Sequence, residues 1–445
     1  MTAAADIARI DTTYAAVIKT SRRASLWPVL LLVAVLVYLA YAWFHFDMTK
    51  LVTQSRFDRG LVLATDSVAY KIHVEHSFKD GSNEFSIEGQ RDTRFADPPP
   101  WVDVLGDGLD IDLGEGYRVL VQGRHVTLTS PDWEPLAATT TEDGVTLEGA
   151  LPEWAKLTDT KFEARPTLFR RVIVLRSGVQ VHRYFLGWED FWFPFNSPLH
   201  DKSLTQVIGL AFSGDRIEAD TPNWRFIFDQ FWTNPEWQHG DVFEALLQTV
   251  IMAFVGTALA AMVGMPLAFL AAANFNRIFI ARMALRRCFD FVRAIDHLIW
   301  SLIFIRAFGL GPLSGIMAIA ITDAGTFGKL FSEAIENIDN KPVDGIASTG
   351  ASATQRYRFG VVPQILPVFV SQSLYYLESN TRSATIIGAL GAGGIGLKLV
   401  ETLRTGVDWE NTAYIISLTV GVVMLMDVFS TWLRRRLISQ GTGSR

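Results

Sequence analysis

The stretch Asp344-Gly-Ile-Ala-Ser-Thr-Gly350, followed by Ala-Ser-Ala-Thr-Gln-Arg-Tyr-Arg-Phe-Gly-Val-Val-Pro363, separates two long apolar runs of the chain. Because glycine commonly follows the last residue of a helix, the spacing predicts a short helix ended by Gly350. About 20 predominantly apolar residues are needed to cross a bilayer. The flanking runs therefore predict membrane crossings that this loop connects.

Apolar runs of similar length recur along the chain, and together they predict six transmembrane helices. They cover Leu26–Phe46, Phe243–Ala273, Phe291–Phe308, Leu313–Phe331, Val361–Ile387 and Ala413–Trp432. The first run is too long for the apolar part of a cleavable signal and no small-residue cleavage site follows it, so we expect it to remain as an anchor.

Basic residues near these runs indicate which ends face the cytoplasm, because cytoplasmic loops carry an excess of Lys and Arg. The basic positions are Lys19, Arg22 and Arg23 before the first run, Arg277, Arg282, Arg286 and Arg287 after the second, Arg356 and Arg358 after the fourth, and Arg434–Arg436 after the sixth. Both termini and the 340–363 loop are then expected in the cytoplasm.

The composition supports a membrane protein with one large polar insert. Hydrophobic residues make up 49% of the 445 residues and charged residues only 19%. From Asp47 to Gly240 the net charge is −11, whereas the rest of the chain carries +5. The single cysteine, Cys288, excludes an intrachain disulfide, so the insert must fold on its hydrophobic core.

The insert alternates apolar and polar residues with the period of β-strands between about 67 and 184. Examples are Tyr70-Lys-Ile-His-Val, Tyr117-Arg-Val-Leu-Val and Val172-Ile-Val-Leu. Turn signals such as Lys79-Asp-Gly-Ser and Glu142-Asp-Gly separate them. A small antiparallel β domain outside the cytoplasm is expected. The aromatic segment Tyr184–Phe195 then lies either on the outer membrane surface or in the core of the β domain.

The loop quoted above resembles the coupling loop of ABC import permeases. In that pattern an acidic residue and two small residues precede a glycine and, thirteen positions later, a proline. Asp344, Gly345, Ile346, Gly350 and Pro363 stand at these positions, with Asp344 in place of Glu and Ile346 in place of Ala. The resemblance implies that the short helix docks on a partner ATPase and transmits its closure as a rigid-body push.

Further motifs resemble the phosphonate-type importer permease over about 220–436, but the β insert has no counterpart in this resemblance. These motifs are Arg293-Ala-Ile, Gly309-Leu-Gly-Pro, Gly325-Thr-Phe-Gly-Lys-Leu-Phe-Ser-Glu-Ala-Ile-Glu, Ala347-Ser-Thr-Gly-Ala and Glu378-Ser-Asn-Thr-Arg-Ser-Ala-Thr-Ile-Ile-Gly. The resemblance implies three partners: an ABC ATPase, a periplasmic phosphonate-binding protein and a second permease copy or paralogue. Phosphate, phosphite or an organophosphate are alternative cargoes.

Ionisable residues inside predicted crossings are candidate functional groups, because charge in hydrocarbon is costly. His297 and Asp323 are expected to pair, unless they lie in water at the membrane boundary. Glu378 and Arg382 share one helix face. They either form a buried ion pair that locks the helix, or Arg382 and Asn380 line the path of an anion. We favour the lock, because Glu378 would cancel the positive field that an anion needs.

Gly391, Gly393, Gly394 and Gly396 satisfy the spacing of a dinucleotide-binding fingerprint, but the run ends a membrane crossing and does not follow a strand. A helix break or a close helix approach is expected there. The sequence has no phosphate-binding loop of the GxxxxGK[ST] type and no catalytic set of residues. No cofactor, metal or enzymatic activity is expected.

The predicted fold is an all-α polytopic membrane protein with an inserted, β-rich extracytoplasmic domain. Its parts are a cytoplasmic tail (1–25), a transmembrane helix (26–46), the β insert (47–200), a linker (201–240), a permease domain (241–436) with the coupling loop at 340–363, and a cytoplasmic tail (437–445). The expected function is that of an inner-membrane importer permease driven by a separate ATPase. The alternative is a membrane-anchored sensor or assembly protein that acts through the β domain.

Overall fold

The computed structural model describes residues 15–53, 57–90, 93–141, 144–200, 202–406 and 408–439. The predicted turn at Glu142-Asp143 and the outer parts of both tails lie outside these residues. The chain divides into two compact units between Val62 and Leu63. The first contains helices α2 (Ala15–His45) and α3 (Met48–Thr53), and α4 (Phe57–Asp66) runs across the division. Within α2, Trp27–His45 is long and apolar enough to cross a membrane.

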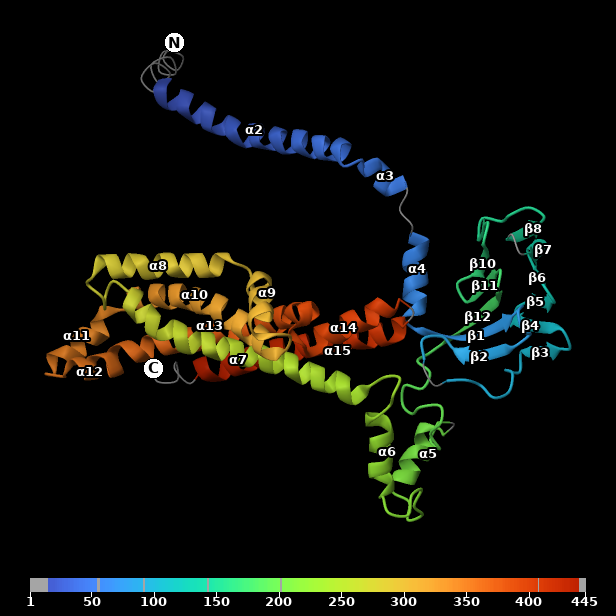
Figure 1. Ribbon diagram of the computed structural model, residues 1–445. Coiled ribbons are helices and arrows are strands. Elements are labelled where there is room, and N and C mark those ends of the chain that lie inside the picture. Colours follow the sequence, from blue (N-terminus) through green and yellow to red (C-terminus); the bar gives the residue numbers. More distant parts are fainter. Residues whose placement is uncertain are drawn as a thin grey trace, which may run out of the picture. The chain divides into compact units, whose positions relative to one another are not determined.

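Two antiparallel six-stranded sheets form the β-rich insert, as the sequence predicts (Figure 1). One sheet has the order β2-β1-β12-β11-β10-β9 and the other has β3-β4-β5-β6-β7-β8. The strands are β1 (Ala69–Ser77), β2 (Asn83–Ile87), β3 (Val102–Leu105), β4 (Gly108–Gly114), β5 (Tyr117–Gln122), β6 (His125–Ser130), β7 (Trp133–Thr140), β8 (Val145–Glu148), β9 (Ala155–Thr158), β10 (Lys161–Thr167), β11 (Arg170–Leu175) and β12 (Gly178–Leu186).

The two sheets share one hydrophobic core, so the insert is a β-sandwich. Val74 and Phe162 from one sheet and Leu109 and Val119 from the other belong to the same cluster of buried residues. Val119 and Val121 are fully buried, Leu120 between them is half-buried, and Arg118 and Gln122 on either side are exposed. This alternation places every second residue of a strand in the core.

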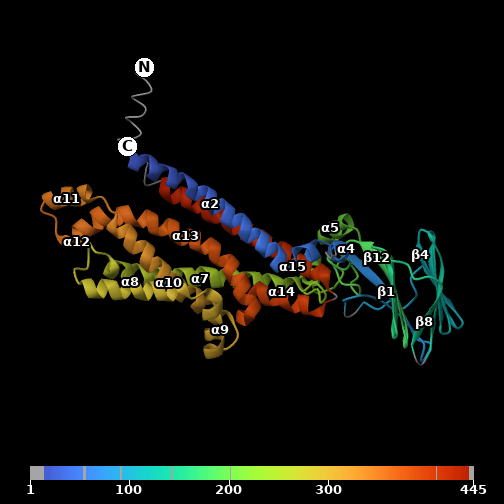
Figure 2. The same cartoon turned by 90° about the horizontal axis from the view of Figure 1, so that it is seen from above.

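The remaining helices follow the sandwich. They are α5 (Leu204–Ala211), α6 (Asn223–Trp232), α7 (His239–Ala271), α8 (Phe279–Ala294), α9 (His297–Phe308), α10 (Pro312–Glu336), α11 (Asn340–Ser348), α12 (Ala353–Arg356), α13 (Val362–Ile387), α14 (Gly394–Thr405) and α15 (Trp409–Ser439), with π-helical turns η1 (Tyr357–Val361) and η2 (Gly388–Ala392). Helices α7, α10 and α13 run side by side (Figures 1 and 2).

Fewer helices than expected have the length and composition of a membrane span. Among the described residues there are three, namely Trp27–His45, His239–Ala271 and Trp409–Leu437, and a fourth if the bent pair Ala353–Ala392 and Gly394–Thr405 counts as one span. The expected continuous crossing at Phe291–Phe308 is wrong. Helix α8 ends at Ala294 and α9 starts at His297, because the Asp296 side chain caps α9 by accepting from the Leu298 N–H.

Glycines let α7 approach α10 closely. A Cβ atom on Gly256 would lie 2.8 Å from Cβ of Ile319, and one on Gly264 would lie 2.8 Å from Cβ of Phe327. On the other side of α10, a Cβ on Gly328 would lie 2.5 Å from the ring of Phe289 in α8. Small residues at such contacts allow the tight packing that joins helices in a membrane.

Candidate functional site

The predicted coupling loop contains a well-defined short helix. Helix α11 starts after Asp339, whose side chain accepts from the Lys341 N–H at 3.0 Å. It ends at Ser348, and Gly350 follows with a φ of +80°, the left-handed conformation that favours glycine at this position. Asp344 and Gly345 are exposed, so the acidic end of the pattern faces outward from this chain.

One face of α11 is held against the start of the next long helix. A Cβ on Gly360 would lie 3.1 Å from the Cα of Val343, so α11 packs directly on η1. The Gln364 side chain accepts from the Asp339 N–H at 2.9 Å and donates to the Asp339 carbonyl at 3.0 Å. Gly360 and Gln364 were not among the predicted site residues. Both act through non-local contacts, which the local pattern does not contain.

Pro363 stands in the first turn of α13, directly after the π-helical turn η1. The turn before it is built by a reciprocal cap in which the Gln355 N–H donates to Ser352 Oγ and Gln355 Oε1 accepts from the Ser352 N–H. From Ala353 onward, α12, η1 and α13 follow one another without a break. A displacement of α11 would reach α13 directly.

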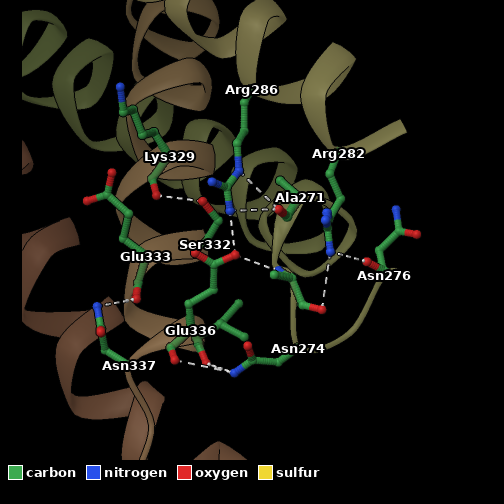
Figure 3. A network of polar contacts seen from close by, with 12 residues as sticks. Ala271, Asn274, Asn276, Arg282, Arg286, Lys329, Ser332, Glu333, Glu336 and Asn337 are labelled. Carbon is green, nitrogen blue, oxygen red and sulfur yellow. Dashed lines mark hydrogen bonds and ion pairs between the residues drawn. The ribbon is translucent and has the colours of Figure 1, made fainter. Parts of the chain in front are cut away.

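A second network fixes the end of α10, just before α11 (Figure 3). The Glu336 carboxylate accepts from the Arg286 guanidinium and, at 2.5 Å, from the Ala273 N–H. Arg286 also donates to the carbonyl of Ala271 at 3.2 Å, and Asn274 donates to the Ile335 carbonyl at 3.0 Å. The ends of α7 and α10 and the middle of α8 are therefore tied together. From the sequence, Arg286 was predicted only to lie on the cytoplasmic side.

Inside the helix bundle, a buried polar cluster surrounds Asp323. Asp323, Asn380 and Thr257 are each at least 96% buried. The Asn380 amide donates to Asp323 Oδ2 at 2.5 Å and to Thr257 Oγ1 at 2.8 Å. Asp323 Oδ1 lies 3.4 Å from Nε2 of His297, so the two residues expected to pair are in contact. Hydrogen bonds of this kind are what make a carboxylate tolerable in a bundle interior.

Glu378 and Arg382 are not joined as the helix-lock hypothesis expects. Among the residues that the structure describes, no ion pair links them, and Arg382 is exposed on α13 while Glu378 is half-buried. Asn380, two positions away from each, points instead into the Asp323 cluster. A spacing of four residues therefore places Glu378 and Arg382 on one helix face, but it does not bring their side chains into contact.

The glycine run interrupts the helix at the end of α13. Gly391, Gly393 and Gly394 have φ values of +113°, +83° and +71°, and α14 leaves the preceding segment at a bend of 58°. Gly396 leaves no room for a side chain, because a Cβ atom added there would lie 1.9 Å from the Thr385 carbonyl oxygen. The run forms a bend between two helices. Its conformation is one that side-chain-bearing residues rarely adopt.

Trp188 and Phe191 of the aromatic segment lie outside the hydrophobic core of the β-sandwich, so that predicted placement is wrong, whereas the placement on the outer membrane surface stays a prediction. Trp188 and Phe191 pack with Trp237 and Tyr414, at the ends of α7 and α15. His239 lies in the same cluster, with one ring nitrogen 2.8 Å from the Tyr414 hydroxyl and the other 2.7 Å from the Phe191 carbonyl. The segment therefore joins the sandwich side of the chain to the helices. Partners as distant along the chain as Tyr414 cannot be read from local composition.

Comparison with known proteins places these features in a family. Residues 264–439 match the family described as binding-protein-dependent transport system inner membrane component. The chain is 35% identical over 190 residues to a phosphite transport system permease protein of Stutzerimonas stutzeri, covering 43% of this chain and 69% of that protein. It is 43% identical over 123 residues to a putative cryptic phosphonate transport system permease protein of Escherichia coli, covering 28% and 100%.

A longer relative is matched only in part. The chain is 34% identical to a phosphate-import permease protein of Mycolicibacterium smegmatis, and the match covers 43% of this chain but only 36% of that protein. Among solved structures, an inward-facing form of the MetNI methionine ABC transporter superposes with a TM-score of 0.40 at 20% identity, covering 44% of this chain and 96% of that one.

The fold and these matches define an integral membrane permease subunit. The chain belongs to the family of binding-protein-dependent transport system inner membrane components.

Proposed function

We propose that the chain is the membrane subunit of an ABC importer that carries phosphonates or related phosphorus oxyanions inward. Relatives that share 32–43% identity are named as phosphite and phosphonate permeases. An ATPase on a separate chain supplies the energy, a periplasmic protein delivers the substrate, and a second permease completes the path. Cytoplasmic termini and a β-sandwich on the outer side agree with the basic clusters of the sequence.

The geometry of α11 is the observation that carries this proposal. Its outer face presents Asp344 and Gly345, while its inner face is pinned by Gly360 and Gln364 to the start of α13. A helix that is exposed on one side and rigidly attached on the other can transmit a push without deforming. In this role α11 docks on the ATPase and moves α13 with it.

The substrate path is proposed to run along the face of α13 that carries Arg382. Its exposed guanidinium is free of Glu378 within the described structure, which supports an anion path over a helix lock. Asn380, Asp323 and His297 lie on the buried side and are proposed to set the position of α13 against α7 and α10. Arg382→Lys is then expected to alter substrate preference while assembly stays normal.

The direct test is ATP hydrolysis by the complex reconstituted in liposomes with its ATPase and binding protein. Methylphosphonate, phosphite and phosphate would be offered in turn, with sulfate as an unrelated oxyanion. The proposal expects stimulation of hydrolysis and uptake by at least one phosphorus compound and none by sulfate. Stimulation by none of the three phosphorus compounds in an intact complex would refute the proposed cargo.

Assembly with the ATPase is tested separately by co-purification in detergent. Gly350→Asp places a side chain where the backbone has a positive φ, at the end of α11. It is expected to release the ATPase, whereas Gly345→Ala, where a Cβ meets nothing within 4 Å, should retain it. Equal retention of the ATPase by both variants would argue against docking through α11.

A further inference from the structure

A cavity of about 490 Å³ opens outside the helix bundle, between the aromatic segment and helices α5 and α6. Its walls are largely aromatic, with Trp192, Trp224 and Phe231 among them. Three metal-ligating side chains, Glu189, Asp190 and His200, lie together on the same cavity. The transport mechanism proposed above uses none of them.

These three side chains are close enough to share one ion. One ligand atom from each lies within 4.8 Å of the others. Nδ1 of His200 is 2.9 Å from Oδ1 of Asp190, and Nε2 of His200 is 3.8 Å from Oε1 of Glu189. Zinc binds imidazole nitrogen and carboxylate oxygen at about 2.0–2.2 Å, so ligands of one ion lie roughly 3–3.5 Å apart. Small side-chain rotations would reach that geometry.

Asp190 provides an independent indication of a missing partner. Its side chain is only 1% exposed, yet neither carboxylate oxygen accepts a hydrogen bond from the residues that the structure describes. Buried carboxylates are normally paired, hydrogen-bonded or bound to a metal. The short contact with His200 is within the cluster itself and leaves Oδ2 without a partner.

The backbone holds Asp190 toward the cavity at a conformational cost. Asp190 has a φ of +55°, which is uncommon for a residue with a side chain. Its carbonyl accepts from the Asn234 amide at 2.7 Å, and the preceding Glu189 carbonyl accepts from Trp237 Nε1 at 2.9 Å. Local strain maintained by surrounding contacts is typical of sites that are built for a ligand.

We propose that Glu189, Asp190 and His200 form a binding site for one divalent transition-metal ion, of which Zn²⁺ is the appropriate probe. Two carboxylates and a neutral imidazole supply a net charge of −2 and the mixed nitrogen–oxygen donors that such ions accept. Three protein ligands leave at least one coordination position open to the cavity, where water can bind. The site lies in the part of the chain that the family match does not cover.

The test uses the full chain, purified in detergent, stripped with a chelator and dialysed. Zn²⁺ is titrated against a chromophoric competitor, and bound metal is counted by mass spectrometry after gel filtration. Wild type is expected to hold one Zn²⁺ per chain. Asp190→Asn and His200→Gln should each weaken binding by about tenfold or more, since each removes a direct ligand. Asp215→Asn removes an exposed carboxylate outside the cluster and should bind as wild type does.

Glu189→Gln guards against variants that fail to fold, because the Glu189 side chain is 34% exposed and is the least buried of the three ligands. It should elute as wild type does and still lose affinity. Co²⁺ in place of Zn²⁺ should give visible absorption bands that vanish in Asp190→Asn. The proposal is overturned if wild type binds no stoichiometric metal, or if all three variants bind it as tightly as Asp215→Asn. In either case His200 simply bridges two carboxylates.

Discussion

The β-sandwich and the helix bundle of this chain bury opposite kinds of side chain. In the sandwich, apolar side chains such as Phe162 and Val119 fill the core and polar ones face outward. In the bundle, large apolar side chains such as Phe254 and Met262 are exposed, while Asp323 and Asn380 are buried. Water surrounds the first region and lipid the second, so an apolar surface is costly only in the first.

The difference shows what holds each region together. The sandwich depends on removing apolar area from water. The bundle gains nothing from hiding apolar groups from lipid, so close glycine contacts and buried hydrogen bonds must join its helices. Substitutions of the same kind should therefore have different effects in the two regions.

The largest expected contrast is between two phenylalanines. Phe162→Ala leaves a cavity in the sandwich core and should cost about 3–5 kcal/mol of its stability. Phe254→Ala removes a side chain that is 59% exposed on α7, and it should cost less than about 1 kcal/mol in a bilayer. Urea-dependent protection of β10 and α7 amides from hydrogen exchange measures both. Equal losses would contradict the comparison.

The next effect concerns the polar cluster of the bundle. Asn380→Ala removes the amide that donates to Asp323 and should cost about 1.5–3 kcal/mol, because it leaves a buried carboxylate without this donor. Asp323→Asn, which keeps the shape, should retain assembly but reduce uptake. Thermal unfolding in lipid nanodiscs and uptake in liposomes are the measurements. Ser379→Ala, at the adjacent half-buried position, is the control. If it loses as much stability as Asn380→Ala, the Asp323 cluster has no special role in holding the bundle.

The third largest effect is expected at the close contact between Gly264 and Phe327. Gly264→Ala adds one methyl group that would meet Phe327 Cβ at 2.8 Å, and overpacking of this kind should cost about 1–3 kcal/mol. Gly421→Ala, where a new Cβ meets nothing within 4 Å in this chain, should be neutral or slightly stabilising. The unfolding temperatures of both variants, compared with that of the wild type, test this prediction. If Gly264→Ala unfolds at the wild-type temperature, close packing of α7 on α10 is not what stabilises the bundle.

The smallest effect is a pH dependence confined to the sandwich. Burial, and then the neighbouring His73 and Arg171, hold the pKa of His182 well below its usual range. The unfolded chain takes up that proton near pH 6.5, whereas the folded chain does not. Stability is therefore fully present above pH 6.5 and falls by up to about 1.4 kcal/mol for each pH unit below it.

Protection of β12 amides, corrected for the intrinsic pH dependence of exchange, should thus decrease from pH 7.5 to 5.5. His182→Gln should reduce that slope, while the exposed His125→Gln should keep it. A slope unchanged in His182→Gln would show that another group causes the pH dependence.

Periodicity and length predicted much of the fold. Tyr70–Val74, Tyr117–Val121 and Val172–Leu175 lie in β1, β5 and β11. Buried positions alternate with more exposed ones in β5, whereas three consecutive residues of β11, Val172 to Val174, are buried. The short helix before Gly350 was predictable because glycine marks a helix end locally. Averaged hydropathy failed at 291–308, where a single cap by Asp296 starts a new helix inside an apolar run.

Apart from the expected pairing of His297 with Asp323, the non-local contacts were not predicted. The clamp of Gln364 on Asp339 and the bond of Asn380 to Asp323 join residues 25 and 57 positions apart. Sharing a helix face also does not require Glu378 and Arg382 to bond, and no ion pair links them among the described residues. Of the candidate site, the sequence therefore predicted the residue types, the loop and the His297–Asp323 pair, but not the other contacts that hold them.

Cross-linking at α11 tests the central claim most directly. Cys288, which is exposed, would first be replaced by serine, and a single cysteine placed at Asp344 or, as a control, at the exposed Glu153 of the sandwich. In the assembled transporter we expect Asp344→Cys to cross-link to the ATPase chain, with a yield that changes when ATP binds, and Glu153→Cys to give no such product. An intact complex in which Asp344→Cys never reaches the ATPase, or reacts only with reagents supplied from the periplasmic side, would contradict the account.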